Sequence, residues 1–494
     1  MTIRPCKEIT DTAQSGLSYR HFILGALLLL LELFVLTASP AHAIPAFARK
    51  YNISCSSCHT KPPRLNPFGE AFHMAGFQIP TVSEGEIKGK RRIGRVMSEI
   101  DFLNIFSART TGDFIRSYSG SQQEEISITL PQDLSLYLAG AFTDGISYFF
   151  ELEYEAIGIE GEKEDKFKEE SQFGLGKEFF FMFHLPTLFS RSGLSGMAGM
   201  ADGSGGMNHG SGSMIHGPMV MAGKIDPSTN FSYPTNRQLI LNLPGKVNPN
   251  LGTIERFGLT PYAFASKFFG VMTADHKSVE VTRSVLYNTP GNLGIDTHIV
   301  IGPALIQVGI MEGFESGPND SNPKKDPYFM GRIDFGGANY LSGSLSSLVY
   351  RGYDTARVPI GGNQTALVDW LRYGFAGNIR YRLLDLYGAF IWDTLKGLPD
   401  GMAETFDKEA SGFTIEGDYL ITDQALLSMR YDQLNSGGLI TKKANGKVLT
   451  AQARYYLRDN FSFYLRDSYN IEKTSKNPLQ NFRNLVALGV DFDF

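Results

Sequence analysis

Hydrophobic and polar residues alternate over long stretches of the chain. The pattern is clearest in the last segment, where apolar side chains occupy every second position from Val486 to Phe494. It recurs in residues 146–154, 413–419, 449–457 and 461–465. A period of two residues predicts β-strands that carry one apolar and one polar face. We therefore expect antiparallel hairpins over much of the chain.

Two folds can use strands of this kind. A soluble sandwich buries the apolar face in a core, whereas an outer-membrane barrel turns it toward lipid. The strands here are long, aromatic residues cluster at their ends, and the chain finishes on Phe494. These features favour a mainly β fold, an antiparallel outer-membrane β-barrel in residues 94–494. At about 9 to 11 residues for each crossing, it would have about 16 strands.

Loop lengths predict how this barrel is oriented. Short turns are expected at residues 142–145, 421–424 and 458–460. Longer polar connections are expected at 160–172, 316–326, 436–447 and 472–481. Barrels of this class have short periplasmic turns and long external loops. The short turns are therefore assigned to the periplasm, in an envelope of the Gram-negative type.

The first 43 residues read as a secretory signal peptide. Arg20 and His21 precede an apolar run over residues 22–36, and small residues at Ala41 and Ala43 suit a cleavage site. A short apolar run with these flanks is typical of a signal that is removed. Export agrees with an outer-membrane location.

A sequence motif after this signal carries the candidate chemistry. Cys55 and Cys58 are separated by two residues, and His59 follows directly. This spacing is the attachment pattern of c-type haem, in which the thiols bind the porphyrin and the imidazole ligates iron. A zinc site needs four ligands and no second pair is present at ligand spacing; a redox dithiol needs a βαβ context that is absent. We expect one covalent haem c in a small helical domain over residues 44–93.

The second axial ligand of that haem has two candidates. His73 and Met74 lie in the same segment, and either one serves equally well as a packing or surface residue. A thioether ligand raises the reduction potential relative to a second imidazole. A high-potential haem would favour Met74.

The N-terminal segment resembles a known family. The stretches 44–51, 55–59 and 63–72 are similar to the opening of the fused outer-membrane monohaem c-type cytochrome–porins, which include iron oxidases of Fe(II)-oxidising bacteria. The resemblance implies a haem domain joined to a porin-like barrel. It further implies an iron oxidase-like electron-transfer oxidoreductase of the Fe(II):cytochrome c type, which would take electrons from extracellular Fe(II) and pass them to a periplasmic c-type cytochrome or another soluble carrier.

The chemistry leaves alternatives open. A single haem exchanges one electron at a time, which suits Fe(II) and does not suit hydride transfer. We expect the barrel to hold the haem near the cell surface, at its mouth or in its lumen. The alternatives are a transport porin in which the haem is a sensor or a plug, and electron transfer with a donor or acceptor other than iron.

Composition adds two points. The net charge of −5 over 494 residues gives no sign of nucleic-acid binding, so the expected surroundings are outer-membrane lipid and small carriers. Residues 197–221 are rich in Gly, Met and His, a pattern that suits Cu(I) but is more often a loop between strands. Acidic strand positions such as Glu151 are expected to belong to an ordinary polar barrel interior.

Overall fold

The computed structural model describes residues 46–62, 64–79, 105–119, 125–159, 168–185, 218–225, 271–272, 278–279, 292–312, 325–337, 341–361, 364–396, 409–435, 445–471 and 484–493. The predicted signal peptide, the predicted domain boundary at residues 93 and 94, and Phe494 lie outside the described residues. The segment that carries the haem motif and the strands that follow it belong to one compact unit, Ile44–Phe494.

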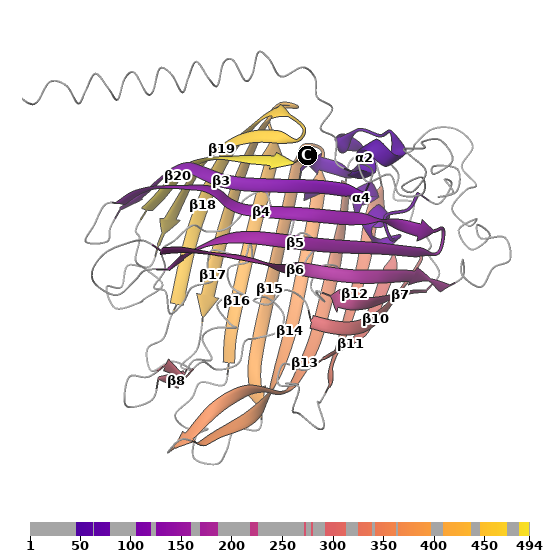
Figure 1. Cartoon of the computed structure of the whole chain (residues 1–494), viewed down its shortest axis with the longest axis vertical. Coiled ribbons are helices and arrows are strands. Elements are labelled where there is room, and N and C mark those ends of the chain that lie inside the picture. Colours follow the sequence, from indigo (N-terminus) through magenta and orange to yellow (C-terminus); the bar gives the residue numbers. More distant parts are fainter. Residues whose placement is uncertain are drawn as a thin grey trace, which may run out of the picture. The chain divides into compact units, whose positions relative to one another are not determined.

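Sixteen antiparallel strands of the described chain close into a barrel (Figure 1). This confirms the predicted fold class and strand number. Their bounds are β3 Phe106–Ser119, β4 Glu125–Thr143, β5 Ile146–Ile159, β6 Lys168–His184, β7 Met219–Ile225, β10 Asn292–Ile301, β11 Ala304–Glu312, β12 Lys325–Gly337, β13 Leu341–Gly361, β14 Gln364–Tyr381, β15 Leu384–Lys396, β16 Glu409–Leu420, β17 Ala425–Asn435, β18 Asn445–Arg458, β19 Phe461–Asn470 and β20 Asn484–Asp493. A separate two-stranded sheet pairs β8 (Val271–Met272) with β9 (Ser278–Val279).

The first and last barrel strands close the cylinder. β20 pairs with β3 from Asn484 opposite Ser119 to Asp493 opposite Arg109. On the inner face of this seam, Arg109 Nη2 lies 2.8 Å from Asp491 Oδ2. Because this seam closes the cylinder, the order of the described strands has no terminal strand, as a β structure needs in order to stand in lipid.

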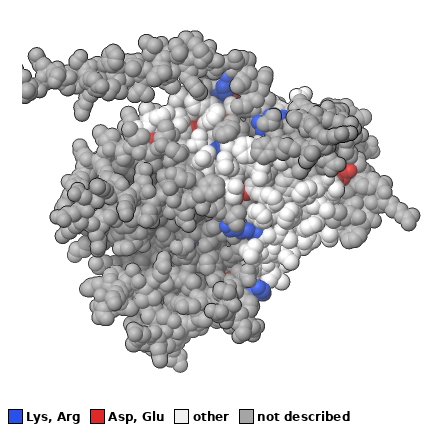
Figure 2. Space-filling model, viewed as in Figure 1, with Lys and Arg blue, Asp and Glu red and all other residues white. Residues whose placement is uncertain are grey.

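The burial pattern of the strands is inverted relative to a soluble protein. On β16, Phe413, Ile415 and Tyr419 are exposed, whereas Glu416 and Asp418 are buried. Figure 2 shows the consequence, because the described surface in this view is mostly uncharged, with only scattered patches of Lys, Arg, Asp and Glu. An apolar exterior around a closed strand cylinder fits a hydrocarbon environment. The protein is an outer-membrane β-barrel.

Among the described residues, no helix is both long enough and apolar enough to cross a membrane.

The short turns predicted from the sequence gather at one end of the barrel. Residues 144–145, 421–424 and 459–460 connect successive strands directly, as expected. Two further tight connections, at residues 302–303 and 382–383, lie at the same end. We call this the short-turn end and assign it to the periplasm.

The lumen near this end has two different sectors. Strands β6, β7 and β10 to β15 contribute an apolar sector that includes Phe180, Tyr350 and Ile391. Strands β16 to β20 and β3 contribute buried ion pairs, such as Arg454 with Asp491 at 2.7 Å. The expected polar interior is found in both sectors, since Asp296, Arg332 and Asp385 are buried within the largely apolar one.

The N-terminal segment, residues 46–79, forms three short helices and one small sheet. They are α2 Ala46–Tyr51, α3 Cys55–Cys58, β1 His59–Lys61, β2 Arg64–Leu65 and α4 Pro67–Met74. Asn66 caps the start of helix α4, because its side chain accepts a hydrogen bond from Gly69 N at 2.9 Å. Pro67 occupies the first helical position.

The end of α4 is equally well defined. Gly76 adopts a left-handed conformation with φ of 69°. Its amide donates to His73 O at 3.1 Å, and the Phe77 amide donates to Phe72 O at 3.0 Å. These are the two bonds of a Schellman cap, and the rings of Phe72 and Phe77 make its hydrophobic contact at 6.1 Å.

Candidate functional site

The predicted haem-attachment residues occupy one helical turn and the residue after it. Cys55 and Cys58 are the first and last residues of α3, both are unpaired thiols, and His59 begins β1. All three are partly buried. A spacing of three residues on a helix places two side chains on the same face. The structure therefore brings both thiols and the imidazole into one small region, as a covalent haem requires.

Asn66 holds this turn against α4. Its side-chain Nδ2 atom donates to Ser56 O at 3.2 Å and to Ser57 O at 3.0 Å. Its backbone amide donates to Cys58 O at 2.9 Å. The same side chain caps α4 through its carbonyl oxygen. One residue thus fixes the attachment turn and starts the next helix.

Gly69 permits the close packing of α3 on α4. A Cβ atom at this position would collide with Cys58 O and would lie 3.0 Å from Leu65 Cδ2. The backbone carbonyl cannot move aside without shifting the turn that carries Cys58. Only glycine fits at residue 69.

Burial changes the acidity of both thiols in the haem-free chain. It raises the pKa of Cys55 from 9.0 to about 11, with Asp459 adding to the shift. It raises the pKa of Cys58 from 9.0 to about 12. Since the thiolate is the reactive form, both groups are weak nucleophiles once the segment is in place.

The two candidate distal ligands lie in the last turn of α4. His73 and Met74 are 9 % and 8 % exposed, so neither is a surface residue. The His73 ring contacts Phe77 edge-on at 5.2 Å, and Met74 belongs to the apolar cluster that the segment shares with the barrel wall. The attachment turn packs on the other end of α4, through Asn66 and Gly69. Ligation by His73 or Met74 therefore stays a prediction.

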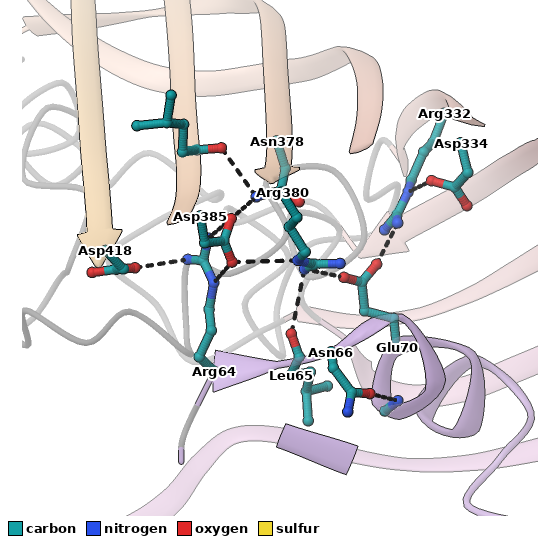
Figure 3. Close-up of polar contacts among 12 residues, drawn as sticks. Arg64, Leu65, Asn66, Glu70, Arg332, Asp334, Asn378, Arg380, Asp385 and Asp418 are labelled. Carbon is teal, nitrogen blue, oxygen red and sulfur yellow. Dashed lines mark hydrogen bonds and ion pairs between the residues drawn. The ribbon is translucent and has the colours of Figure 1, made fainter. Parts of the chain in front are cut away.

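Two buried charges tie the segment to the barrel (Figure 3). Arg64, on β2, donates through Nε to Asp385 Oδ2 and places Nη2 near Asp385 Oδ1, both at 2.9 Å. Its Nη1 atom lies 3.9 Å from Asp418 Oδ2. A guanidinium group bound by two parallel contacts to one carboxylate is a strong and directional anchor.

Glu70, on α4, forms the second anchor (Figure 3). Its Oε1 atom accepts from Arg380 Nη2 at 2.6 Å, and its Oε2 atom accepts from Arg332 Nη2. Arg380 also donates to Leu65 O at 3.3 Å. Burial acts to raise the pKa of Glu70, but the Arg332 and Arg380 charges outweigh it and hold that pKa below 4.5. Glu70 is therefore ionised in the docked segment.

Further contacts place the segment at the short-turn end. Tyr456 donates to Pro62 O at 2.9 Å, Gln78 donates to Thr143 O at 2.8 Å, and Lys61 lies 3.6 Å from Asp459. Thr143 precedes one short turn, and Asp459 lies in another. The segment thus lies in the lumen, as expected, but at the short-turn end, which we assign to the periplasm and not to the cell surface.

The sequence motif predicts attachment residues but gives no sign of the anchors. Arg64 and Asp385 are 321 positions apart, so nothing local links them. The available signal was the presence of Arg64 and Glu70 in an otherwise apolar and aromatic stretch. Charges in such a setting are buried only with partners.

The Met- and His-rich stretch is described only at its end. Residues 197–217 lie outside the described residues. Met219 and Met221 are on β7, both are buried, and both face the lumen. β6 ends and β7 begins at the short-turn end, because His184 N donates to Gly145 O and Leu185 N to Pro218 O.

Comparison with known proteins finds similarity at the level of structure. No protein-family model and no curated protein matches the chain. Solved structures that resemble it include OprB of Pseudomonas putida, at 9 % identity and a TM-score of 0.46, covering 79 % of this chain and 94 % of that one. An anion-selective porin from Comamonas acidovorans shows 13 % identity and a TM-score of 0.43, covering 79 % and 98 %. A loop-deletion mutant of OmpT from Vibrio cholerae shows 10 % identity and a TM-score of 0.43, with the same coverage. The assignment to the outer membrane rests on the closed strand order and the inverted burial pattern of the chain itself.

Proposed function

We propose that the protein is an iron oxidase-like electron-transfer oxidoreductase of the outer membrane. Cys55, Cys58 and His59 would hold one covalent haem c, which supplies one-electron exchange when bound. The electron donor would be extracellular Fe(II), and the acceptor a periplasmic c-type cytochrome or another soluble carrier. The observation that carries the proposal is the attachment motif on a single helical turn within a segment that buried ion pairs fix to the barrel.

The chain's own residues would perform three tasks. Asn66 and Gly69 set the geometry of the attachment turn, and Arg64 and Glu70 fix the segment in the lumen. The side chains next to the motif, among them Ser54 and Ser56, are exposed. An exposed rim at the short-turn end gives a periplasmic carrier direct access to the motif.

The position of the segment also bears on the route of the donor. Because the motif is at the periplasmic end, Fe(II) would approach it from the long-loop side through the barrel. The sector of β16 to β20 and β3, with its buried carboxylates, offers the polar side of that route. Electron delivery to the periplasm would then need no long path through protein.

A transport porin that carries haem as a plug or sensor is the alternative. The closed barrel supports it, since this architecture is used for passive channels. The ion-paired segment at one end of the lumen opposes free permeation. Electron transfer with a donor other than iron shares the same site and differs only in the reductant.

Stopped-flow reduction of the oxidised protein tests the proposal. Fe(II) mixed with the purified mature protein should reduce the haem, seen at its absorption bands, and His59→Ala should abolish the fast phase while the barrel still assembles. Reduction by ascorbate but not by Fe(II), at acidic and at neutral pH, would show that iron is not the donor.

Haem attachment has its own test. The denatured mature protein should keep haem-dependent peroxidase staining in a gel, and a double Cys55→Ala, Cys58→Ala variant should lose it. For the distal ligand, Met74→Ala should lower the reduction potential if the thioether ligates, whereas His73→Ala should alter the spectrum if the imidazole does. Staining that persists in the double cysteine variant would reject covalent attachment.

A further inference from the structure

Three neighbouring strands place sulfur and imidazole side chains side by side on the lumen wall. In one cross-strand row, His184 of β6 is opposite Met219 of β7, which is opposite His298 of β10. In the next inward-facing row, Met182 is opposite Met221, which is opposite Asp296. All six side chains are at most 5 % exposed, and we call them the Met/His patch.

The geometry of a sheet brings these donors within reach of one ion. Residues directly opposite each other lie about 4.5 to 5.5 Å apart, and residues two positions apart on a strand lie about 7 Å apart. Met219, Met221 and His298 therefore form a compact triangle of long side chains on one face. Such a triangle lets three donor atoms converge above the wall.

The N-terminal segment closes over this patch. A Cβ atom on Gly76 would lie 3.2 Å from Met182 Sδ and 3.4 Å from Met219 Cε. The side chains of Met182 and Met219, from adjacent strands, thus meet beneath residue 76. The patch is enclosed by the wall on one side and by the end of α4 on the other.

His298 has the hydrogen-bonding state of a metal ligand. Its Nε2 atom lies 3.2 Å from Met74 O, and a carbonyl oxygen can only accept, so Nε2 carries the proton. The lone pair of a neutral ring is then on Nδ1, which is buried and has no hydrogen-bond partner in the described chain. Metal-binding imidazoles commonly donate their other N–H to a carbonyl in this way.

Asp296 is a second buried group with an oxygen atom that accepts no hydrogen bond in the described chain. Its Oδ2 atom accepts from Tyr328 and from Gln307, both at 2.7 Å. Its Oδ1 atom has no hydrogen-bond partner in the described chain. A carboxylate beside Met221 would offset one positive charge in the patch.

We propose that Met182, Met219, Met221 and His298 form a binding site for Cu(I). Thioether and imidazole donors are soft and uncharged, which selects a soft monovalent cation over divalent ions that prefer oxygen or thiolate. Among the described residues, no group of three or more His, Cys, Asp or Glu side chains could hold a metal ion, so a site for a harder ion finds no support there. The site goes beyond electron transfer through haem and does not depend on it.

Competitive titration with Cu(I) is the test. The purified mature protein in detergent, kept anaerobic, should take one Cu(I) per chain from the chromogenic chelator bicinchoninate. A double Met219→Leu, Met221→Leu variant keeps the volume of the patch and should bind at least roughly 100-fold more weakly. Cu K-edge absorption of the wild-type complex should show sulfur and nitrogen neighbours together.

Matched variants separate the patch from other methionines. Met311→Leu with Met330→Leu changes two buried methionines of the same apolar cluster, outside the Met/His patch, and should leave affinity unchanged. Leucine at Met200, Met207 and Met214 should also leave it unchanged. His298→Gln keeps a donor for Met74 O but removes the ring lone pair, so this variant should bind Cu(I) more weakly. It remains an independent test if the double methionine variant fails to fold.

The proposal is overturned by any of three results. The first is a wild-type copper environment without sulfur. The second is equal affinity in the wild type and in a folded double variant, with folding judged by heat-modifiable migration. The third is loss of binding on changing Met200, Met207 and Met214 while the patch is intact.

Discussion

The packing of α3 on α4 depends on the absence of a side chain at Gly69. We predict that Gly69→Ala displaces the attachment turn, because the new methyl group would overlap Cys58 O. Haem staining per folded barrel should fall several-fold. Gly388→Ala is the matched control, since its Cβ would approach nothing closer than 3.4 Å. Equal haem content in the two variants would show that α3 and α4 need not pack this tightly.

The thiols give a second prediction at the residue scale. The pKa of Cys55, raised from 9.0 to about 11 by burial, reduces its thiolate fraction at pH 8 by roughly 100-fold, and Cys58 is shifted in the same direction. Iodoacetamide should therefore alkylate the haem-free protein, refolded in detergent, about 100-fold more slowly than the same chain in urea. The difference should shrink as pH rises above 9.

This prediction has a consequence for assembly. If the docked thiols are unreactive, haem must be attached before the segment enters the barrel. Haem-free protein that has already folded should then be a poor substrate for attachment. Equal alkylation rates in detergent and in urea would remove the basis for this order of events.

At the scale of elements, the docking of α4 rests on Glu70. We predict that Glu70→Gln loosens the segment, because it removes the carboxylate that Arg332 and Arg380 share. The loss is at most about 3 to 5 kcal/mol, since Asp334 and Asp385 remain as their other partners. Trypsin should then cut the segment faster at Arg49 and Lys50. Asp423→Asn changes an exposed short turn at the same end, and trypsin should cut this variant at the wild-type rate. Unchanged cleavage of the Gln variant would mean that the remaining contacts suffice.

The same anchor predicts a dependence on pH. The docked-state pKa of Glu70 lies below 4.5, so its contribution to docking is complete above pH 4.5 and is lost as pH falls through the docked-state value. Wild-type cleavage by an acid-active protease should rise on strong acidification. The rise should be smaller for Glu70→Gln, which has no carboxylate to protonate, although Asp385 also faces Arg64 and Arg380.

Elements were predictable from sequence to the extent that they are local. Alternation in residues 413–419 and 449–465 correctly predicted β16, β18, β19 and the turn between the last two. Alternation also fixed which face is apolar, because a strand has only two faces. Alternation could not show that Phe180 and Met182 face the lumen and pack among apolar side chains. Both faces of the wall are apolar there, so the sequence does not distinguish the inner face from the outer one.

The predicted attachment site likewise has features that are local in sequence and features that depend on distant residues. Cys55, Cys58 and His59 lie within five residues, so spacing alone suffices for the prediction that they attach haem. Their placement at the short-turn end depends on pairs such as Arg64 with Asp385, which only the closed barrel brings together. Alternation carries no information about partners on distant strands.

At the scale of the whole molecule, the N-terminal segment lies within one end of the barrel. The segment of residues 46–79 meets strands on several sides of the lumen, through Tyr456 of β18, Arg332 of β12 and Thr143 at the end of β4. Contacts from several directions hold a plug more firmly than contacts from one side. Under the proposed function, a segment held in this way would favour electron transfer at that end over the passage of solutes.

Conductance distinguishes these two roles for the intact molecule. We predict that the complete mature protein in a planar bilayer conducts poorly, and that deletion of residues 46–79 raises single-channel conductance by about tenfold, because a barrel of this size encloses a wide lumen. Heat-modifiable migration and β circular dichroism should be unchanged by the deletion, since all barrel strands remain. Glu70→Gln should give intermediate behaviour, with brief openings. If the complete protein already conducts as well as the deletion variant, the segment does not close the lumen, and a haem-bearing transport porin becomes the better description.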